Sequence, residues 1–330
     1  IVPCRNEEVF IESCLDSLIA QQYPRELIEI LAVDGQSTDN TRSIIKKLGN
    51  RFSFLALLDN PKRYKPSALN IGINRARGDL IMIIDAHAQY ERDYLSRCIS
   101  SLMTYHADVV GGILKTEPRV PTLPARAIAA VLSHPLGVGG SVFRKGSSRP
   151  REVDTVFGGC YRKEIFDRVG LFNEHLIRSQ DMEMNIRIRH AGGKIMLDPS
   201  IVCTYYPKST LGAFFKHNLT DGIWAIYPLK FVSIPLRLRH YIPLLFILVL
   251  LALIIGSFLA PIVVLTLATC ATLYILTTMA ASVQIAQRKK DLLLTPFLML
   301  AFWARHFGYG IGSLIGIVKL TYGGTKTKRN

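Results

Sequence analysis

The sequence lacks charge over one long stretch, because residues 241–287 contain no Asp, Glu, Lys or Arg. A bilayer core of about 30 Å is crossed by roughly 20 helical residues, so this run is long enough for two spans and a short turn. Acidic residues are also scarce overall, since 25 Asp and Glu stand against 40 Lys and Arg, which gives a formal net charge of +15. The sequence therefore predicts a membrane-associated protein and excludes a purely soluble one.

The six cysteines form no Cys-x-x-Cys pair and show no regular spacing. This argues against a disulfide framework or a zinc ribbon and predicts free thiols in a reducing compartment. The first 240 residues also lack a basic stripe with interleaved aromatics, which argues against a nucleic-acid partner. Basic residues instead gather around the apolar segments of residues 241–330, where anionic lipid headgroups would attract them. Membrane lipids are therefore a predicted partner.

Apolar runs alternate with helical patterns through residues 1–205. The runs Ile28–Val33 and Leu80–Ile84 predict buried strands, and residues 8–22 carry apolar side chains at the i, i+3, i+4 spacing of a helix. This alternation is typical of an α/β domain with a mostly parallel, Rossmann-like sheet and helices on both faces. We expect residues 1–205 to form that domain.

Three polar motifs follow predicted strands: Arg5-Asn6-Glu7, Asp34–Asp39 and Asp85-Ala86-His87. Ligands of doubly wound sheets bind beyond the carboxyl ends of the strands, so we expect the three motifs to converge on one pocket. Asp34 could accept hydrogen bonds from a nucleotide, although closing its polar turn is the simpler role for this residue.

Asp85 and His87 place a carboxylate and an imidazole two residues apart. A pyrophosphate leaving group needs a divalent cation, and Mg²⁺ or Mn²⁺ favours carboxylate oxygens, with imidazole acceptable for Mn²⁺. The alternative is that Asp85 caps a turn and His87 has no ligand role. Asp181, at the start of a predicted helix, could act as a general base or could only stabilise the helix dipole.

The C-terminal part of the chain predicts membrane contact. Residues 206–240 mix aromatics with cations, as helices in the headgroup region do, and spans are expected over about 241–258 and 262–283. A third apolar segment, 293–318, either spans the membrane or lies at its surface. It contains Arg305-His306, which are costly in lipid and therefore predict a functional or headgroup-pairing role.

The positive-inside rule gives the orientation of these segments. Arg237 and Arg239 before the first span and Arg288–Lys290 after the second fall on one side, which the rule makes cytoplasmic. We therefore expect a multi-pass protein of the inner (cytoplasmic) membrane, with its catalytic domain in the cytoplasm.

Five motifs in order resemble those of family 2 glycosyltransferases, which have the GT-A fold: residues 1–8, residues 33–39, Ala68-Leu69-Asn70, Asp85-Ala86-His87 and Gln180-Asp181. Residues 137–143, 154–158 and 181–187 further resemble the membrane-bound glucosyltransferases of succinoglycan-type exopolysaccharide assembly. The fold class expected from this resemblance is an α/β GT-A domain followed by membrane helices.

The resemblance also implies roles for individual residues. A nucleotide sugar would be bound by Pro3, Arg5, Glu7, Asp34, Lys65, Asn70 and Asp85. The metal, Mg²⁺ or Mn²⁺, would be bound by Asp85 and His87, and Asp181 would be the catalytic base. The acceptor side would comprise Gly158, Gly159, Arg178, Gln180 and Trp224.

The sequence departs from the family pattern in three places. His87 occupies the third position of the D-x-D motif, Gln180 replaces the usual Glu, and the Q-x-x-R-W motif of processive synthases is missing. The last departure argues against a processive polymerase.

The implied activity is an inverting transfer of a hexose, with glucose favoured, from a UDP-sugar to a hydroxyl of a polyprenyl-diphosphate-linked saccharide in surface polysaccharide biosynthesis. Other polysaccharide-assembly proteins are conceivable partners. Two alternatives stay open from sequence: a polyprenyl-phosphate sugar synthase, whose ionised acceptor needs no base, and a non-catalytic membrane protein that senses nucleotide.

Overall fold

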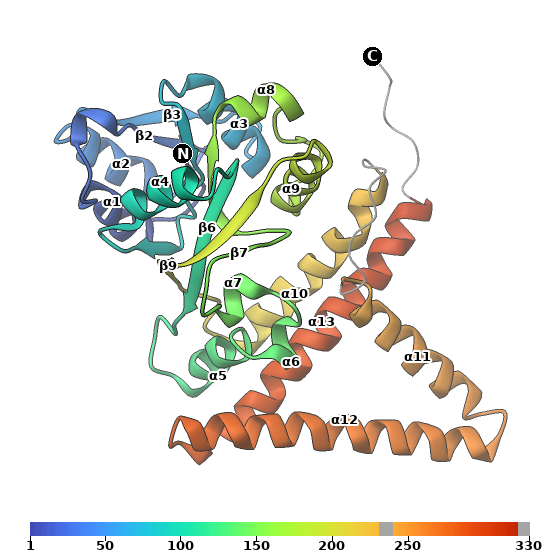
Figure 1. Cartoon of the computed structure of the whole chain (residues 1–330). Helices are drawn as coiled ribbons and strands as arrows, with labels where there is room; N and C mark the ends of the chain where they lie inside the picture. Colours follow the sequence, from blue (N-terminus) through green and yellow to red (C-terminus); the bar gives the residue numbers. More distant parts are fainter. Residues whose placement is uncertain (231–239, 323–330) are drawn as a thin grey trace. The chain divides into compact units, whose positions relative to one another are not determined.

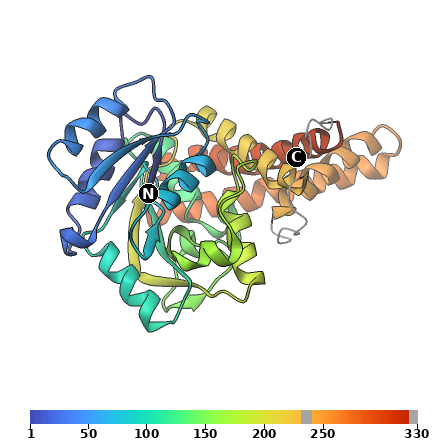
Figure 2. The ribbon, with the colours of Figure 1, turned by 90° about the horizontal axis from the view of Figure 1, so that it is seen from above.

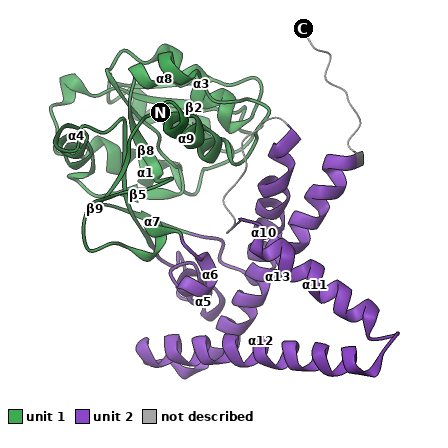
Figure 3. Cartoon of the chain, turned by 45° about the vertical axis from the view of Figure 1, so that its right-hand side comes forward, with its two compact units in different colours: residues 1–115, 141–206 green, residues 116–140, 207–330 purple. Residues whose placement is uncertain are grey.

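The computed structural model describes residues 1–230 and 240–322, which form two compact units (Figures 1 and 3). Unit 1 comprises residues 1–115 and 141–206, and unit 2 comprises residues 116–140 and the chain from residue 207 onward. The sequence places residues 116–140 inside the first domain, whereas in the structure they cluster with the C-terminal helices.

Unit 1 begins with a parallel three-stranded sheet in the order β1-β2-β3. Its strands are β1 (Val2–Cys4), β2 (Ile30–Asp34) and β3 (Leu55–Asp59). In this register Pro3 lies opposite Val33, and Val33 lies opposite Leu58. Every residue of β2 is buried, as expected for the central strand of a parallel sheet that is covered on both faces.

Helices cover both faces of this sheet because the side chains of β2 alternate between two cores. Ile30 and Ala32 pack in one core with α1 (Ile11–Ile19), α2 (Thr41–Gly49) and α4 (Tyr94–Thr104). Leu31 and Val33 pack in the other core with α3 (Lys65–Arg75), α8 (Glu164–Val169) and α9 (Gln180–His190). The predicted layering of helices on both faces is therefore observed.

The second sheet of unit 1 has the order β4-β8-β6-β9-β5, with β7 pairing to β9. Its strands are β4 (Leu80–Met82), β5 (Ala88–Tyr90), β6 (Val109–Thr116), β7 (Arg151–Glu152), β8 (Phe157–Arg162) and β9 (Ile195–Tyr205). The pairs β4–β8, β6–β8, β5–β9 and β7–β9 are antiparallel. The expectation of a mostly parallel sheet thus holds for β1–β3, and unit 1 as a whole is mixed, because apolar periodicity identifies a buried strand without fixing its direction.

Two short pieces complete unit 1: η1 (Arg25–Leu27) before β2 and α7 (Val142–Lys145) before β7. The first sheet meets the second where the Ile84 N–H donates a hydrogen bond of 2.9 Å to the carbonyl of Ile1. The carboxyl end of β4, followed by Asp85, therefore lies beside the start of β1.

Unit 2 is helical in the residues described. Its helices are α5 (Leu123–Val131), α6 (Pro135–Val138), α10 (Leu211–Ile226), η2 (Tyr227–Lys230), α11 (Ile242–Gly256), α12 (Pro261–Arg288), η4 (Leu292–Leu294) and α13 (Thr295–Tyr322). Of the predicted interfacial segment 206–240, residues 231–239, with Arg237 and Arg239, lie outside the described residues, as do residues 323–330.

The glycine-rich half of α13 forms a close helix–helix contact with α10, and the two helices lie side by side in Figures 1 and 2. A Cβ at Gly312 would lie 2.0 Å from the carbonyl oxygen of Leu219, and a Cβ at Gly222 would lie 2.0 Å from that of Tyr309. Small residues at such positions let two helix backbones approach closely. The third apolar segment expected over 293–318 is therefore part of one long helix that packs against another.

Arg305 and His306, expected to serve a functional or headgroup-pairing role, are instead bonded within unit 2. Arg305 Nε donates to the carbonyl of Gly137 at 3.1 Å, and its Nη1 donates to Asn218 Oδ1. His306 Nε2 lies 2.9 Å from the carbonyl oxygen of Leu136. These contacts compensate the burial of polar groups, so lipid headgroups are not needed to explain either residue.

Among residues 1–230 and 240–322, one helix, α12, is long and apolar enough to cross a membrane. Only 6% of its most apolar window is buried, and Leu265 and Leu273 are 63% and 59% exposed. α11 has 15 residues, which at 1.5 Å per residue is about 22 Å, short of a bilayer core of about 30 Å. Of the two expected spans, 241–258 and 262–283, only the second coincides with a candidate.

Candidate functional site

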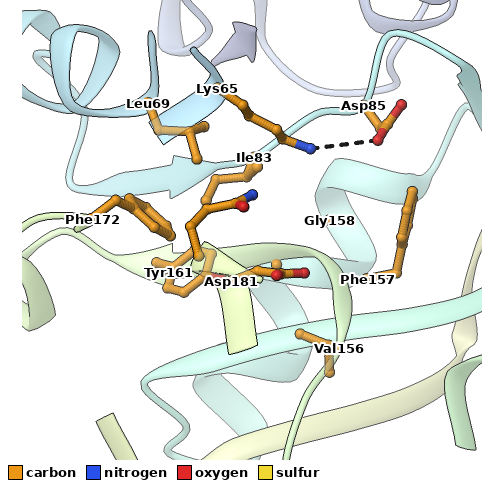
Figure 4. A pocket seen from close by; sticks show the side chains of 12 residues that line it. Lys65, Leu69, Ile83, Asp85, Val156, Phe157, Gly158, Tyr161, Phe172 and Asp181 are labelled. Carbon is orange, nitrogen blue, oxygen red and sulfur yellow. Dashed lines mark ion pairs between the residues drawn. The ribbon is translucent and has the colours of Figure 1, made fainter. Parts of the chain in front are cut away.

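One pocket in unit 1 gathers several of the predicted site residues. Its empty space is about 410 Å³, and part of that space is open solvent. Its walls come from the start of α3, the end of β4, the start of β8, the loop after α8 and the start of α9. The lining residues are Lys65, Leu69, Ile83, Asp85, Val156, Phe157, Gly158, Gly159, Tyr161, Phe172, Gln180 and Asp181 (Figure 4).

Lys65 and Asp85 form an ion pair at the pocket, with Lys65 Nζ 3.5 Å from Asp85 Oδ2 (Figure 4). The main chain holds Asp85, because its N–H donates to Tyr90 Oη at 2.8 Å and the His87 N–H donates to its Oδ1 at 3.0 Å. Burial by itself raises the pKa of Asp85, but the charges of Lys65 and His87 outweigh burial and bring that pKa below its ordinary value. Asp85 is therefore an ionised carboxylate at neutral pH.

His87 does not line the pocket. Its Nδ1 lies 3.1 Å from Glu7 Oε2 and 3.6 Å from Asp85 Oδ1, and its ring stacks on Phe10 with centroids 4.9 Å apart. The residues described contain no group of three or more His, Cys, Asp and Glu side chains arranged to hold a metal ion. Asp85 is thus the predicted metal ligand that faces the pocket, and the role of His87 as a ligand stays a prediction.

Asp34 is fully buried at the end of β2 and does not line the pocket. Its carboxylate accepts hydrogen bonds from the N–H and Oγ of Ser37 at 3.0 and 2.5 Å and from Arg42 Nη1 at 2.7 Å. Arg42 also pairs with Asp59, at the end of β3, at 2.7 Å. The expected convergence of all three polar motifs on one pocket is therefore only partly observed.

The motif at residues 5–7 lies beside the Asp34 turn, as their adjacent strand ends require. The Asn6 N–H donates to Ser37 Oγ at 2.9 Å, and the Glu7 N–H donates to Thr41 Oγ1 at 2.7 Å. A Cβ on Gly35 would lie 3.3 Å from the Arg5 side chain, so Arg5 lies against that glycine. Pro3, Arg5, Glu7 and Asp34 form one group, which is joined to Asp85 through the Glu7–His87 contact.

Asn70 is buried, and its side-chain amide forms hydrogen bonds with the loop after α8. Its Nδ2 donates to the carbonyl of Phe172 at 2.9 Å and to Glu174 Oε1 at 3.1 Å, while its Oδ1 accepts from the Phe172 N–H at 2.9 Å. It does not line the pocket, although its neighbour Leu69 does. Its expected role as a nucleotide ligand stays a prediction.

The start of α9 supplies Gln180 and Asp181 to the pocket. Asp181 is exposed, and Figure 4 shows it on the opposite side from the Lys65–Asp85 pair. Gln180 is 5% exposed, and its Oε1 has no hydrogen-bond partner among the described residues. Burial, and then the negative charge of Asp181, raises the pKa of Tyr161, so this phenol stays protonated. Arg178 lies outside the pocket lining, and Trp224 belongs to α10 of unit 2.

Gly158 and Gly159 form one wall, and a side chain is disfavoured at each position. Gly158 has a φ of +54°, in the left-handed region that L-residues rarely adopt. A Cβ at Gly159 would lie 2.7 Å from Cε2 of Tyr161. The paired glycines therefore leave main chain facing the pocket.

The sequence analysis did not predict the apolar walls of the pocket or the contacts that Arg187 makes with Glu183 and Leu171. Phe157, Tyr161 and Phe172 line the pocket, and no polar pattern marks them. Arg187 bonds Glu183 four residues earlier, with Nε 2.6 Å from Oε1, and its Nη2 donates to the carbonyl of Leu171 at 2.8 Å. The i, i+4 spacing of opposite charges on one helix was the available signal for this pair.

Comparisons with known proteins agree with this arrangement. Residues 1–169 match the family model "Glycosyl transferase family 2". Over 229 residues the chain is 34% identical to the dolichyl N-acetyl-alpha-D-glucosaminyl phosphate 3-beta-D-2,3-diacetamido-2,3-dideoxy-beta-D-glucuronosyltransferase of Methanococcus voltae. This match covers 67% of this chain and 70% of that protein. Over 251 residues it is 31% identical to the succinoglycan biosynthesis protein ExoA of Rhizobium meliloti, covering 71% and 75% of the two chains.

Among solved structures, the mannosyltransferase PcManGT from Pyrobaculum calidifontis, in complex with GDP-Man and Mn²⁺, matches with a TM-score of 0.57. The match has 21% sequence identity and covers 98% of this chain and 86% of that chain. This likeness confirms the expected GT-A fold. The family match and the two relatives set aside a non-catalytic nucleotide sensor. The chain is a glycosyltransferase and belongs to glycosyl transferase family 2.

Proposed function

We propose that this enzyme transfers a hexosyl unit, with inversion, from a UDP-sugar to a hydroxyl of a polyprenyl-diphosphate-linked saccharide. One observation carries the proposal: a solvent-accessible carboxylate, Asp181, shares a single pocket with the Lys65–Asp85 pair. Two relatives support a lipid-linked saccharide as the acceptor, because the name of one specifies a dolichyl-phosphate-linked sugar and that of the other a role in succinoglycan biosynthesis.

The reaction assigns separate roles to the two sides of the pocket. Asp181 takes the proton of the acceptor hydroxyl, and the resulting oxygen forms a bond to the anomeric carbon from the face opposite the diphosphate. The bond from that carbon to the diphosphate oxygen breaks, and UDP leaves with the bonding electron pair. Charge develops on the diphosphate only as this bond breaks, so Lys65 stabilises the transition state more than the ground state.

A divalent cation fits the Asp85 side of the pocket. Mg²⁺ is commonly held by one or two carboxylates together with substrate phosphates, so Asp85 with the donor diphosphate is a sufficient ligand set. When bound, such a cation supplies positive charge against the leaving diphosphate. Asp85, held by Tyr90 and the His87 N–H, presents its carboxylate in fixed orientation for that purpose.

The acceptor class agrees with the surface of unit 2. The exposed apolar length of α12 would be buried in lipid. The helix ends at Arg288, and Lys289 and Lys290 follow it, where anionic headgroups attract cations. Attachment to the cytoplasmic membrane, with the catalytic domain on the cytoplasmic side, agrees with an acceptor that is itself anchored in lipid.

A panel of radiolabelled UDP-sugars, incubated with the purified enzyme and a membrane lipid extract, tests this function. The expected result is label from one UDP-hexose in a lipid product that keeps its diphosphate, with loss of transfer in EDTA and recovery on adding Mg²⁺ or Mn²⁺. A single labelled sugar joined directly to a lipid monophosphate would instead identify a polyprenyl-phosphate sugar synthase. Label from no UDP-sugar would refute the proposed donor.

A further inference from the structure

The loop between α8 and α9, residues 170–179, leads directly into the helix that carries Asp181. It is bound to a different helix, α3, through Asn70, whose amide forms the three hydrogen bonds with Phe172 and Glu174 described above. Both N–H donors of that amide and one acceptor site are used. Asn70 is 7% exposed, so water cannot replace these bonds easily.

Two further contacts hold the same loop. Lys62, just before α3, places its Nζ 2.6 Å from Glu174 Oε2. At the other end, Arg187 of α9 donates to the carbonyl of Gly170 at 3.2 Å and to that of Leu171 at 2.8 Å. The loop is therefore fixed from α3 in its middle and from α9 at its start.

α3 also carries the opposite side of the pocket. Lys65, at its first position, pairs with Asp85, and Leu69 lines the pocket next to Asn70 in sequence. Phe172, whose backbone Asn70 holds at both N–H and C=O, lines the pocket from the loop. A single helix thus positions both the Lys65–Asp85 pair and the loop leading to Asp181.

We infer that Asn70 is a positioning residue that sets the loop 170–179, and through it Asp181, relative to the Lys65–Asp85 pair. This inference rests on the proposed function, in which Asp181 is the base. It differs from the expectation that Asn70 binds nucleotide, because the amide has only one acceptor site left for a ligand. Asn70 touches no reacting atom and acts through Asp181.

The test compares Asn70→Asp and Asn70→Ala with Asn74→Asp, an exposed asparagine one turn later on α3. An aspartate at position 70 cannot donate to the carbonyl of Phe172 and puts a negative charge beside Glu174. We expect kcat to fall at least tenfold in both Asn70 variants, with the donor KM and the UDP dissociation constant within twofold of wild type. Asn74→Asp should match wild type in all three.

Two additional variants separate positioning from a loss of folding. In the Asp181→Asn background, Asn70→Asp should lower kcat less than twofold further, because both changes remove the same step. Combining Asn70→Asp with Glu174→Gln should recover part of the lost kcat, since an amide at position 174 can donate to the new carboxylate. The inference would be overturned if Asn70→Asp lowered kcat by the same factor with and without Asp181→Asn. It would also be overturned if Glu174→Gln recovered none of the kcat lost in Asn70→Asp.

The outcome for nucleotide binding is equally decisive. A raised donor KM with unchanged kcat in Asn70→Asp would make Asn70 a nucleotide ligand and refute the positioning role. If the wild-type enzyme transfers no sugar, the proposed function fails, but amide hydrogen exchange still tests the contact. Exchange across residues 170–179 should be faster in Asn70→Ala than in wild type, and unchanged exchange would contradict the inference.

Discussion

The pocket of unit 1 and the helix α12 of unit 2 differ in how their side chains are surrounded. At and beside the pocket, Asp85 is paired with Lys65 and Asn70 is hydrogen-bonded to Phe172, in each case by a residue of another element. Along α12, apolar side chains such as Leu265 and Leu273 remain exposed over most of the helix. The pocket depends on contacts within the protein, so single substitutions there should reduce activity. Helix α12 depends on the solvent or lipid around it, so substitutions there should change membrane association.

The largest expected effect concerns the base. Asp181→Asn removes the group that takes the acceptor proton, and general-base catalysis contributes about 10²–10⁴-fold in rate, so kcat should fall by at least 100-fold. The donor KM should change little. Initial-rate kinetics with Asp167→Asn, an exposed acid on the neighbouring helix α8, serves as the control. A loss of only a few-fold in Asp181→Asn would remove Asp181 as the base.

The next effect tests the exposed helix. Leu265→Lys combined with Leu273→Lys puts two charges on α12, and each charge at the centre of a membrane helix costs about 2.5–3.5 kcal/mol. We expect the protein to shift from the membrane pellet to the supernatant by at least tenfold in fractionation. Leu27→Lys changes an equally exposed leucine in unit 1, at 68% exposure, and should leave the distribution unchanged. If all variants pelleted alike, α12 would not be the anchor.

A smaller effect is expected inside unit 2. Gly312→Ala places a methyl group against the Leu219 carbonyl and should destabilise the α10–α13 contact by about 1–3 kcal/mol, seen as a lower unfolding temperature in detergent. Gly212→Ala on α10 is a matched control, because a Cβ there meets nothing within 4 Å. Equal unfolding temperatures for the two variants would show that the helices do not pack this closely.

The smallest effect is on pH dependence. The pKa of Asp85 lies below its ordinary value, so the stability it contributes is present above its unfolded pKa of about 3.9 and is lost as pH falls through the lower folded pKa. Lys65→Met removes a charge that lowers this pKa, so the acid limb of kcat/KM should move to higher pH. Lys47→Met, on the exposed side of α2, should leave that limb in place. A limb that did not move would exclude Lys65 as a cause of the shift.

Local patterns predicted much of unit 1. Strand ends carrying Asp34 and Asp85 and a helix starting at Gln180 follow from apolar runs and capping signals, which act over a few residues. The antiparallel pairing of β6, β8 and β9 could not be predicted from local patterns, because the direction of a strand depends on its pairing with strands far away in the sequence. The family resemblance supplied the GT-A fold, which periodicity alone could not distinguish from other doubly wound folds.

The candidate site was predicted in its acids but not in its supporting contacts. Asp85 and Asp181 were predicted because they stand after a strand and at a helix start in motifs that resemble those of the family, while Asn70 has the same sequence signal whether it binds a ligand or a loop. Its bonds to Phe172 join residues 102 apart, a distance over which no pattern extends. Likewise the length of apolar sequence over 241–283 does not reveal that α11 ends after 15 residues.

The consecutive glycines at 158 and 159 have a consequence for how this enzyme can diversify. One has a backbone angle that L-residues rarely adopt, and the next has an aromatic ring where its side chain would lie, so a larger residue is disfavoured at both positions. That part of the cavity keeps its contour in any close variant of the chain. Substitutions that reshape the pocket without straining the backbone are therefore available at Val156, Phe157 and Phe172, whose side chains line it.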